Sequence, residues 1–185
     1  LLLVFVFLLG GAALLYRQLG QSVETDQLAA REEQQQESGG GSEPEQKTEA
    51  PDFTVYDREG REVRLSDYTG KPIVLNFWAS WCGPCQSEMP DFHEKYLELG
   101  DEIQFLMVNA TDGSRETVET ASAFVEENAY TFPVLYDTQS LAAYAYGAYS
   151  LPSTFFIDAD GNLVARAAGA IDGETLQRGI DMIAG

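Results

Sequence analysis

The sequence predicts an α/β fold, in which helices cover both faces of a central mixed β-sheet. Short apolar runs alternate along the chain with segments of helical periodicity, which is the pattern of such layered folds. Extended segments joined by turn residues begin and end this region and indicate a hairpin at each end. The length of 185 residues allows one domain with its own core and further segments outside it.

The first predicted elements follow Pro51, where the composition becomes that of a globular domain. Residues 53–56 and 62–65 flank the polar sequence DREGR, so they predict an N-terminal hairpin. The apolar run IVLNFW at 73–78 predicts a buried strand. A helix is expected over 82–99, because apolar side chains recur there at spacings of three and four residues.

The central part of the chain predicts two further strands and two helices. Residues 103–108 form the next apolar run, and a strand is also expected over 132–136. Between them, residues 114–128 have helical periodicity, and a short helix is expected over 138–146. The apolar face of the longer helix consists of Val118, Ala121 and Val125.

The last elements are a second hairpin and a closing helix. Strands over 154–158 and 163–168 are joined through Asp160-Gly161, which is a strong hairpin turn sequence. Asp172 is a suitable N-cap for a final helix that ends at Ile183. The side chains expected to face inward from this helix are Leu176, Ile180 and Ile183.

The N-terminal segment 1–16, LLLVFVFLLGGAALLY, carries no charge and predicts a hydrophobic membrane anchor. A complete span needs about 20 apolar residues. We expect the anchor to be truncated, because the chain begins at Leu1 without a methionine. A retained anchor is the favoured interpretation, and a cleaved signal peptide is the alternative.

Residues 17–50 predict a flexible acidic linker between this anchor and the domain at 51–185. They contain three basic and eight acidic side chains and include the run REEQQQESGGGSEPEQKTEA at 31–50, which has almost no apolar residues. Such a segment cannot bury enough apolar surface to offset the entropy lost on ordering.

The charge of the chain argues against nucleic acid as a partner. The formal net charge is −19, from 11 basic and 30 acidic residues, and a chain this acidic is repelled by phosphate groups. Most of the excess lies in the domain at 51–185, which has eight basic and 22 acidic residues. The acidity is interpreted as a solvated surface that favours solubility.

The chain contains only two cysteines, Cys82 and Cys85, so it has no framework of structural disulfides. With His93 as the one histidine, it also lacks the four N/S ligands of a structural zinc site. No metal site is therefore predicted.

The sequence Trp81-Cys82-Gly83-Pro84-Cys85 lies between the predicted strand at 73–78 and the helix that follows. The first N–H groups of a helix have no internal partner and carry partial positive charge, which favours a thiolate at Cys82. Pro84 fits the first helical turn, where its missing N–H costs nothing. Cys82 would attack a disulfide, and Cys85 would resolve the mixed disulfide. No cofactor is expected beyond the Cys82–Cys85 disulfide.

The stretch FWASWCGPC at 77–85 resembles the active-site sequence of thioredoxins. Within that superfamily, the chain is most similar to the membrane-anchored, extracytoplasmic thioredoxins of the TlpA/ResA type. Residues 114–136 resemble the central insertion of that group, QSEMP at 86–90 its helix after the second cysteine, and LPSTFFID at 151–158 its proline loop and strand. The resemblance covers 51–185 and implies a thioredoxin-like fold.

The resemblance also implies roles for individual residues. Pro152 would follow a cis peptide bond beside the cysteines, and the backbone of Leu151 would pair with a substrate strand. Asn76 occupies the position of the buried aspartate of thioredoxins, and Glu88 is its expected replacement near the thiols. Asn76 itself is interpreted as a residue that satisfies local hydrogen bonds. Glu88 could instead be an ordinary solvated helix residue. Trp81 is expected either to shield Cys82 and contact partners or to pack in the core.

The resemblance implies a thiol–disulfide oxidoreductase, favoured as a reductase of extracytoplasmic protein disulfides such as those of apocytochrome c. Its electrons would come from a CcdA/DsbD-type membrane donor, and its catalytic domain would lie outside the cytoplasm in the cell envelope. A disulfide oxidase or isomerase is the alternative enzyme. A copper-binding chaperone is a non-enzyme alternative, because soft thiolates suit Cu(I). The tyrosines at 144, 146 and 149 could belong to the core or to a partner surface.

Overall fold

The computed structural model of the chain describes residues 28–30 and 48–185. The predicted membrane anchor at 1–16 lies outside the described residues, as does most of the predicted linker at 17–50. Within the described part, no helix has both the length and the apolar character needed to cross a bilayer.

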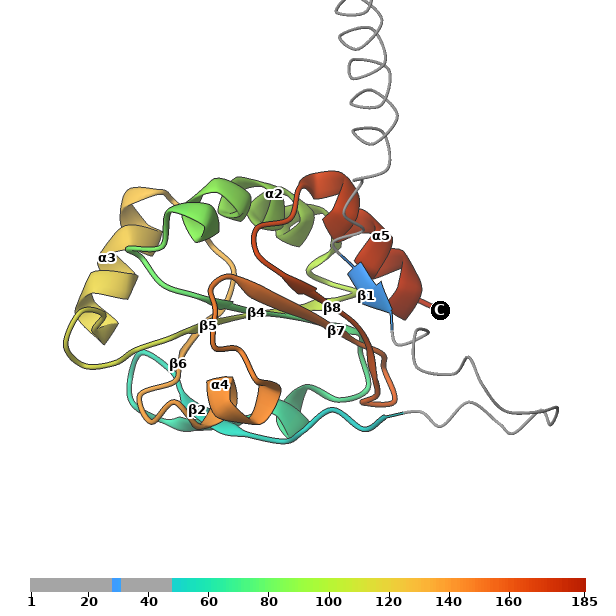
Figure 1. Cartoon of the computed structure of the whole chain (residues 1–185), viewed down its shortest axis with the longest axis horizontal. Coiled ribbons are helices and arrows are strands. Elements are labelled where there is room, and N and C mark those ends of the chain that lie inside the picture. Colours follow the sequence, from blue (N-terminus) through green and yellow to red (C-terminus); the bar gives the residue numbers. More distant parts are fainter. Residues whose placement is uncertain (1–27, 31–47) are drawn as a thin grey trace, which may run out of the picture.

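One mixed sheet contains the eight strands of the described residues, in the order β1-β8-β7-β4-β5-β6-β2-β3. Its centre, β4-β5-β6, is parallel, and every other neighbouring pair is antiparallel. The strands are β1 (Leu28–Ala30), β2 (Thr54–Tyr56), β3 (Glu62–Arg64), β4 (Ile73–Trp78), β5 (Gln104–Asn109), β6 (Val134–Tyr136), β7 (Ser153–Ile157) and β8 (Leu163–Ala168). Strand β1 comes from the predicted linker and pairs with β8 at one edge (Figure 1).

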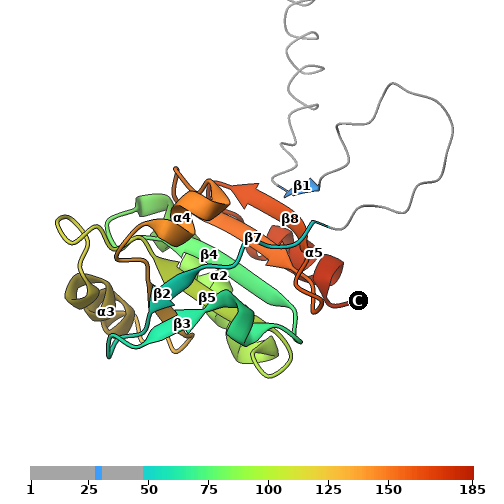
Figure 2. The same cartoon turned by 90° about the horizontal axis from the view of Figure 1, so that it is seen from below.

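Helices cover both faces of the sheet, as the sequence predicted. Helices α2, α3 and α5 lie on one face and the short α4 lies on the other (Figure 1). Seen from below, α4 is in front of the strands and α5 is behind them (Figure 2). The helices are α2 (Gly83–Leu99), α3 (Val118–Glu127), α4 (Leu141–Tyr146) and α5 (Gly173–Ile183), with one 3-10 turn η1 (Leu65–Tyr68).

Strand β4 separates two hydrophobic clusters because its side chains alternate between the faces of the sheet. Val74 and Trp78 belong to the cluster under α2, α3 and α5, whereas Leu75 and Phe77 belong to the cluster on the α4 side. All six residues of β4 are buried, so the apolar run predicted the central strand correctly.

Helix α5 lies unusually close to strand β7. A Cβ atom added at Gly179 would lie only 2.2 Å from the ring of Phe156. Only glycine therefore allows α5 to rest directly on the sheet at this point.

Three predicted elements begin two or more residues later than expected, each for a local reason. Helix α3 starts at Val118 because Thr117 is its N-cap, with Oγ1 accepting from the N–H of Thr120. Strand β6 starts at Val134, directly after Pro133, which has no N–H for sheet pairing. Helix α4 starts at Leu141, because the carboxylate of Asp137 accepts hydrogen bonds from backbone N–H groups in its first turn.

Candidate active site

The two cysteines lie at the start of α2 and form a disulfide, with Cα atoms 5.2 Å apart. Cys82 is the N-cap residue, and its Sγ accepts a hydrogen bond from the backbone N–H of Cys85 at 3.3 Å. One of the free N–H groups of the helix therefore points at the sulfur of Cys82, as the sequence predicted. Gly83 and Pro84 complete the first turn, and both are exposed between the two buried cysteines.

Glu88 lies one helical turn after Cys85, and its carboxyl group is buried in the core. Its Oε1 accepts a hydrogen bond from Nδ2 of Asn76 at 2.8 Å, and its Oε2 accepts one from the backbone N–H of Ile171 at 3.0 Å. Nδ2 of Asn76 also donates to Oγ1 of Thr154 at 3.0 Å. The carboxyl group of α2 is thus linked directly to β4 and to the segment before α5, and through Asn76 to β7.

Burial raises the pKa of Glu88 from 4.5 to about 7, although the hydrogen bonds from Ile171 and Asn76 lower it. At neutral pH the group therefore exists in both protonation states, which suits the relay of a proton to or from a thiol. The interpretation of Glu88 as an ordinary solvated residue is wrong, because only 2% of the residue is exposed.

The loop before β7 contributes Leu151 to the surroundings of Cys82. The peptide bond between Leu151 and Pro152 is cis, as the resemblance implied. The carbonyl oxygen of Pro152 accepts a hydrogen bond from the N–H of Gly169 at 2.9 Å, which ties this loop to the end of β8. Leu151 and Cys82 line the same surface groove.

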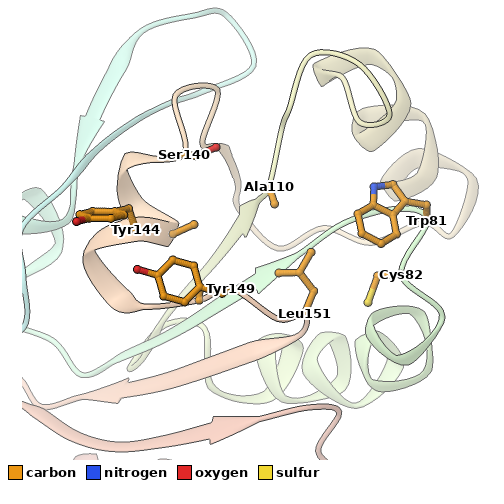
Figure 3. Close-up of a pocket in the computed structure, with 9 residues that line it drawn as sticks. Trp81, Cys82, Ala110, Ser140, Tyr144, Tyr149 and Leu151 are labelled. Carbon is orange, nitrogen blue, oxygen red and sulfur yellow. The ribbon is translucent and has the colours of Figure 1, made fainter.

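This groove has a volume of about 410 Å³ and extends away from Cys82. Trp81 forms one end and is 41% exposed, so it does not pack in the core. Tyr144 and Tyr149 form the other end and are 73% and 79% exposed, with Leu151 between the two ends (Figure 3). None of the nine lining residues is charged, so the groove presents an aromatic and apolar surface next to the nucleophile.

The tyrosine cluster at 144, 146 and 149, which the sequence left undecided, is divided between the core and the surface groove. Tyr146 is buried against Phe53, Phe77 and Phe155, whereas the other two tyrosines face the groove. The one histidine lies elsewhere: Nε2 of His93 is 3.1 Å from Oγ1 of Thr131. Within residues 28–30 and 48–185, no group of three or more His, Cys, Asp or Glu residues is arranged to hold a metal ion.

Sequence reasoning missed a second buried carboxylate close to the active site. Glu116 accepts hydrogen bonds from Ser80 and Asn109, and the guanidinium carbon of Arg115 lies 3.6 Å from the ring centroid of Trp81. The expected helix over 114–128 placed these residues in its first turn. The Thr117 cap sequence could have shown that they precede the helix, but no pattern in the sequence indicates what they contact.

Known proteins resemble the chain in both sequence and structure. Residues 47–166 match the AhpC/TSA family. The chain is 38% identical over 135 residues to Thiol-disulfide oxidoreductase ResA of Geobacillus thermodenitrificans (strain NG80-2), covering 72% of this chain and 75% of the relative. It is 31% identical over 134 residues to Thioredoxin-like protein YneN of Bacillus subtilis (strain 168), covering 72% and 78%.

Two solved structures have the same fold. A putative Thiol:disulfide interchange protein DsbE from Chlorobium tepidum matches with a TM-score of 0.67 and 29% identity, over 75% of this chain and 97% of that chain. The exposed lipoprotein thioredoxin Etrx1 of Streptococcus pneumoniae strain TIGR4 matches with a TM-score of 0.60 and 34% identity, over 71% and 98%. The predicted thioredoxin-like fold is thus confirmed, and the chain belongs to the AhpC/TSA family as a ResA-related thiol–disulfide oxidoreductase.

Proposed function

We propose that the protein reduces disulfide bonds of extracytoplasmic proteins, such as apocytochrome c, with the Cys82–Cys85 pair as its redox group and no other cofactor. The observation that carries this proposal is the buried carboxyl group of Glu88 one turn from Cys85. A carboxylate near the thiols disfavours their thiolates and so favours the disulfide form of the enzyme. An enzyme whose own disulfide is favoured passes its electrons to the substrate.

Two further features of the site support the reducing direction. The residues between the cysteines, Gly83-Pro84, match those of thioredoxin, whose potential is about −270 mV against about −120 mV for the strong oxidant DsbA. The domain at 51–185 has 22 acidic and only eight basic residues, and this excess of negative charge also disfavours thiolates. The helix N-terminus acts in the opposite sense on Cys82, so the potential reflects a balance.

The catalytic cycle starts from the reduced enzyme. The Cys82 thiolate attacks one sulfur of the substrate disulfide, an S–S bond to Cys82 forms, and the substrate S–S bond breaks. The leaving sulfur takes up a proton from solvent, which balances the proton that Cys82 lost to solvent when its thiolate formed. Cys85 then loses its proton to the carboxylate of Glu88 and attacks Sγ of Cys82, so the Cys82–Cys85 disulfide forms and the bond between Cys82 and the substrate breaks. The departing substrate sulfur takes up the proton from Glu88, which restores the carboxylate. Two electrons and two protons pass to the substrate.

The groove between Trp81 and the two exposed tyrosines is the proposed docking surface for the substrate. Tyrosine and tryptophan provide large contact areas that lose little conformational entropy on binding. Because Cys82 and Leu151 also line the groove, a peptide lying there would bring its own disulfide to the nucleophile.

The remaining parts of the proposal concern the cell envelope. The apolar segment 1–16 would hold the protein at the membrane, with the catalytic domain outside the cytoplasm. The oxidised pair would then be reduced by a dithiol of a CcdA/DsbD-type membrane protein through the same exchange reaction run in reverse. A cleaved N-terminal segment would instead give a secreted enzyme.

The test is the reduction potential of the Cys82–Cys85 couple, measured by equilibration with glutathione or dithiothreitol buffers. We expect a value near or below about −250 mV, because the site resembles thioredoxin and contains a buried carboxyl group. A value above about −180 mV would contradict the reductase and indicate an oxidase or isomerase. If no disulfide formed in any buffer, the redox function itself would be wrong.

A further inference from the structure

Glu116 is buried in the loop that connects β5 to α3, and the proposed cycle gives it no task. We propose that Glu116 is a positioning residue that holds the nucleophile Cys82 at the N-terminus of α2 by binding Ser80. The proposal concerns thiol–disulfide exchange itself, so it applies whether the protein reduces or oxidises its substrates.

The carboxylate of Glu116 is fully buried and accepts three hydrogen bonds. Its Oε1 accepts from the backbone N–H of Ser80 at 2.8 Å and from Nδ2 of Asn109 at 2.7 Å. Its Oε2 accepts from the hydroxyl of Ser80 at 2.7 Å. All three donors are neutral, and two of them belong to one residue of the active-site turn.

Ser80 is a central residue of the turn that brings the chain from β4 to the nucleophile. The N–H of Cys82 donates to the carbonyl oxygen of Ala79 at 3.1 Å, so Ser80 and Trp81 are the two residues inside the turn. The carbonyl oxygen of Ser80 accepts a hydrogen bond from Nε2 of Gln86 on α2. The N–H, hydroxyl and carbonyl groups of Ser80 are therefore all bound, and Glu116 binds two of them.

The same loop also holds the second residue of the turn. The guanidinium carbon of Arg115 lies 3.6 Å from the ring centroid of Trp81, which is a cation–π contact. The loop is itself kept in shape by Oδ1 of Asp112, which accepts from the N–H groups of Ser114, Arg115 and Glu116 at 2.7, 2.7 and 3.0 Å. Two adjacent residues of the insertion thus fix both residues that precede Cys82.

Two substitutions at Glu116 distinguish the effect of its negative charge from the effect of its hydrogen bonds. In Glu116→Gln, Oε1 can still accept from Ser80 and Asn109, and Nε2 can donate to the hydroxyl oxygen of Ser80. In Glu116→Asp, the carboxylate keeps its charge but is one methylene too short to reach both partners. If the role of Glu116 is positional, Glu116→Gln keeps the exchange rate and Glu116→Asp lowers it. If the role is electrostatic, the two variants show the reverse.

The experiment measures kcat/KM for reduction of a protein disulfide, together with the rate of Cys82 alkylation as a function of pH. We expect Glu116→Gln to stay within about threefold of the wild type, and Glu116→Asp and Glu116→Ala to lose about tenfold or more, since small misplacements of a reacting group cost this much. The alkylation midpoint should shift to higher pH in Glu116→Asp, because Cys82 loses its alignment with the helix N-terminus, and should show no upward shift in Glu116→Gln.

The matched control is Ser122→Ala, because the hydroxyl of Ser122 is buried in α3 and pairs with the hydroxyl of Tyr136 at 2.7 Å. It removes a buried hydrogen bond from the same insertion and should leave exchange unchanged. If Glu116→Ala fails to fold, Ser80→Ala replaces it and should reduce kcat/KM about tenfold, clearly more than Glu116→Gln, since a hydrogen bond to the charged carboxylate is lost. Wild-type exchange in folded Glu116→Asp, or equal slowing in Ser122→Ala, would overturn the proposal.

Discussion

Glu88 and Glu116 both have buried carboxyl groups, and each is associated with a different cysteine. Glu88 lies on α2 itself, one turn after Cys85, and accepts two hydrogen bonds. Glu116 comes from the insertion and accepts three, two of them from the turn before Cys82. In the two proposals above, Glu88 accordingly exchanges a proton with Cys85, whereas Glu116 keeps Cys82 in position.

The largest expected effect is the loss of turnover when either cysteine is replaced by serine, and the two variants should differ in the intermediate that they accumulate. Cys82→Ser should abolish turnover, a loss of at least about 10³-fold, because the first S–S bond cannot form. Cys85→Ser should also abolish turnover but should accumulate the mixed disulfide, because resolution is blocked. Non-reducing electrophoresis with a disulfide-bonded substrate measures this difference, and equal trapping by both variants would show that the roles are assigned wrongly.

The next effect is the pH dependence that Glu88 gives to stability. Its pKa in the folded protein is about 7, above the ordinary value of 4.5, so the folded state binds this proton more tightly. The resulting stabilisation is complete below about pH 4.5 and is lost as the pH rises through 7, a change of about 3 kcal/mol. Glu88→Gln should remove this dependence, and denaturant unfolding at pH 5 and pH 8 measures it.

The Glu88→Gln variant can keep its hydrogen bonds if the amide of Asn76 rotates. Oδ1 of Asn76 has no partner among the described residues and would then accept from the new Nε2. Glu126→Gln is the matched control, because Glu126 is exposed and pairs with Arg58 on the surface. An unchanged difference between pH 5 and pH 8 in Glu88→Gln would show that the dependence arises from other groups.

The smallest expected effect lies at the far end of the groove, away from both carboxyl groups. Replacing Tyr144 and Tyr149 together by alanine should raise KM for a protein disulfide about threefold to tenfold, because exposed aromatic contact area is lost. A small disulfide such as oxidised dithiothreitol should be unaffected, since it does not extend along the groove. Leu97→Ala, at a side chain 67% exposed outside the groove, is the control. An equal loss with both substrates would place the tyrosines in the chemistry instead.

The comparison of Glu88 with Glu116 also shows how far the sequence alone could predict this site. Glu88 could be identified because it follows Cys85 by three residues on one helix, and helical spacing is readable from a sequence. Glu116 and Ser80 are 36 residues apart, and their contact depends on how the insertion folds over the turn. No local pattern encodes such a contact.

The same distinction holds for the elements of the fold. The buried strands β4 and β5 and the hairpin β7–β8 were predicted because apolar runs and Asp160-Gly161 are strong local patterns. The helix predicted over 114–128 began too early. Ser114 and Thr117 are both suitable N-caps, and only the structure shows that Thr117 is the one used. The division of the tyrosine cluster likewise depends on which face of α4 rests on the sheet.

The direct contact of Gly179 with the sheet has a consequence for which mutations this protein can tolerate. Any side chain at this position would push α5 away from Phe156. Ile171, whose N–H binds Glu88, lies just before α5 and would move with it. Losing that hydrogen bond would raise the proton affinity of Glu88 still further. A substitution of Gly179, which contacts neither cysteine, would thus change the pH dependence of the enzyme. Its effect on activity would be similar to that of a mutation in the active site.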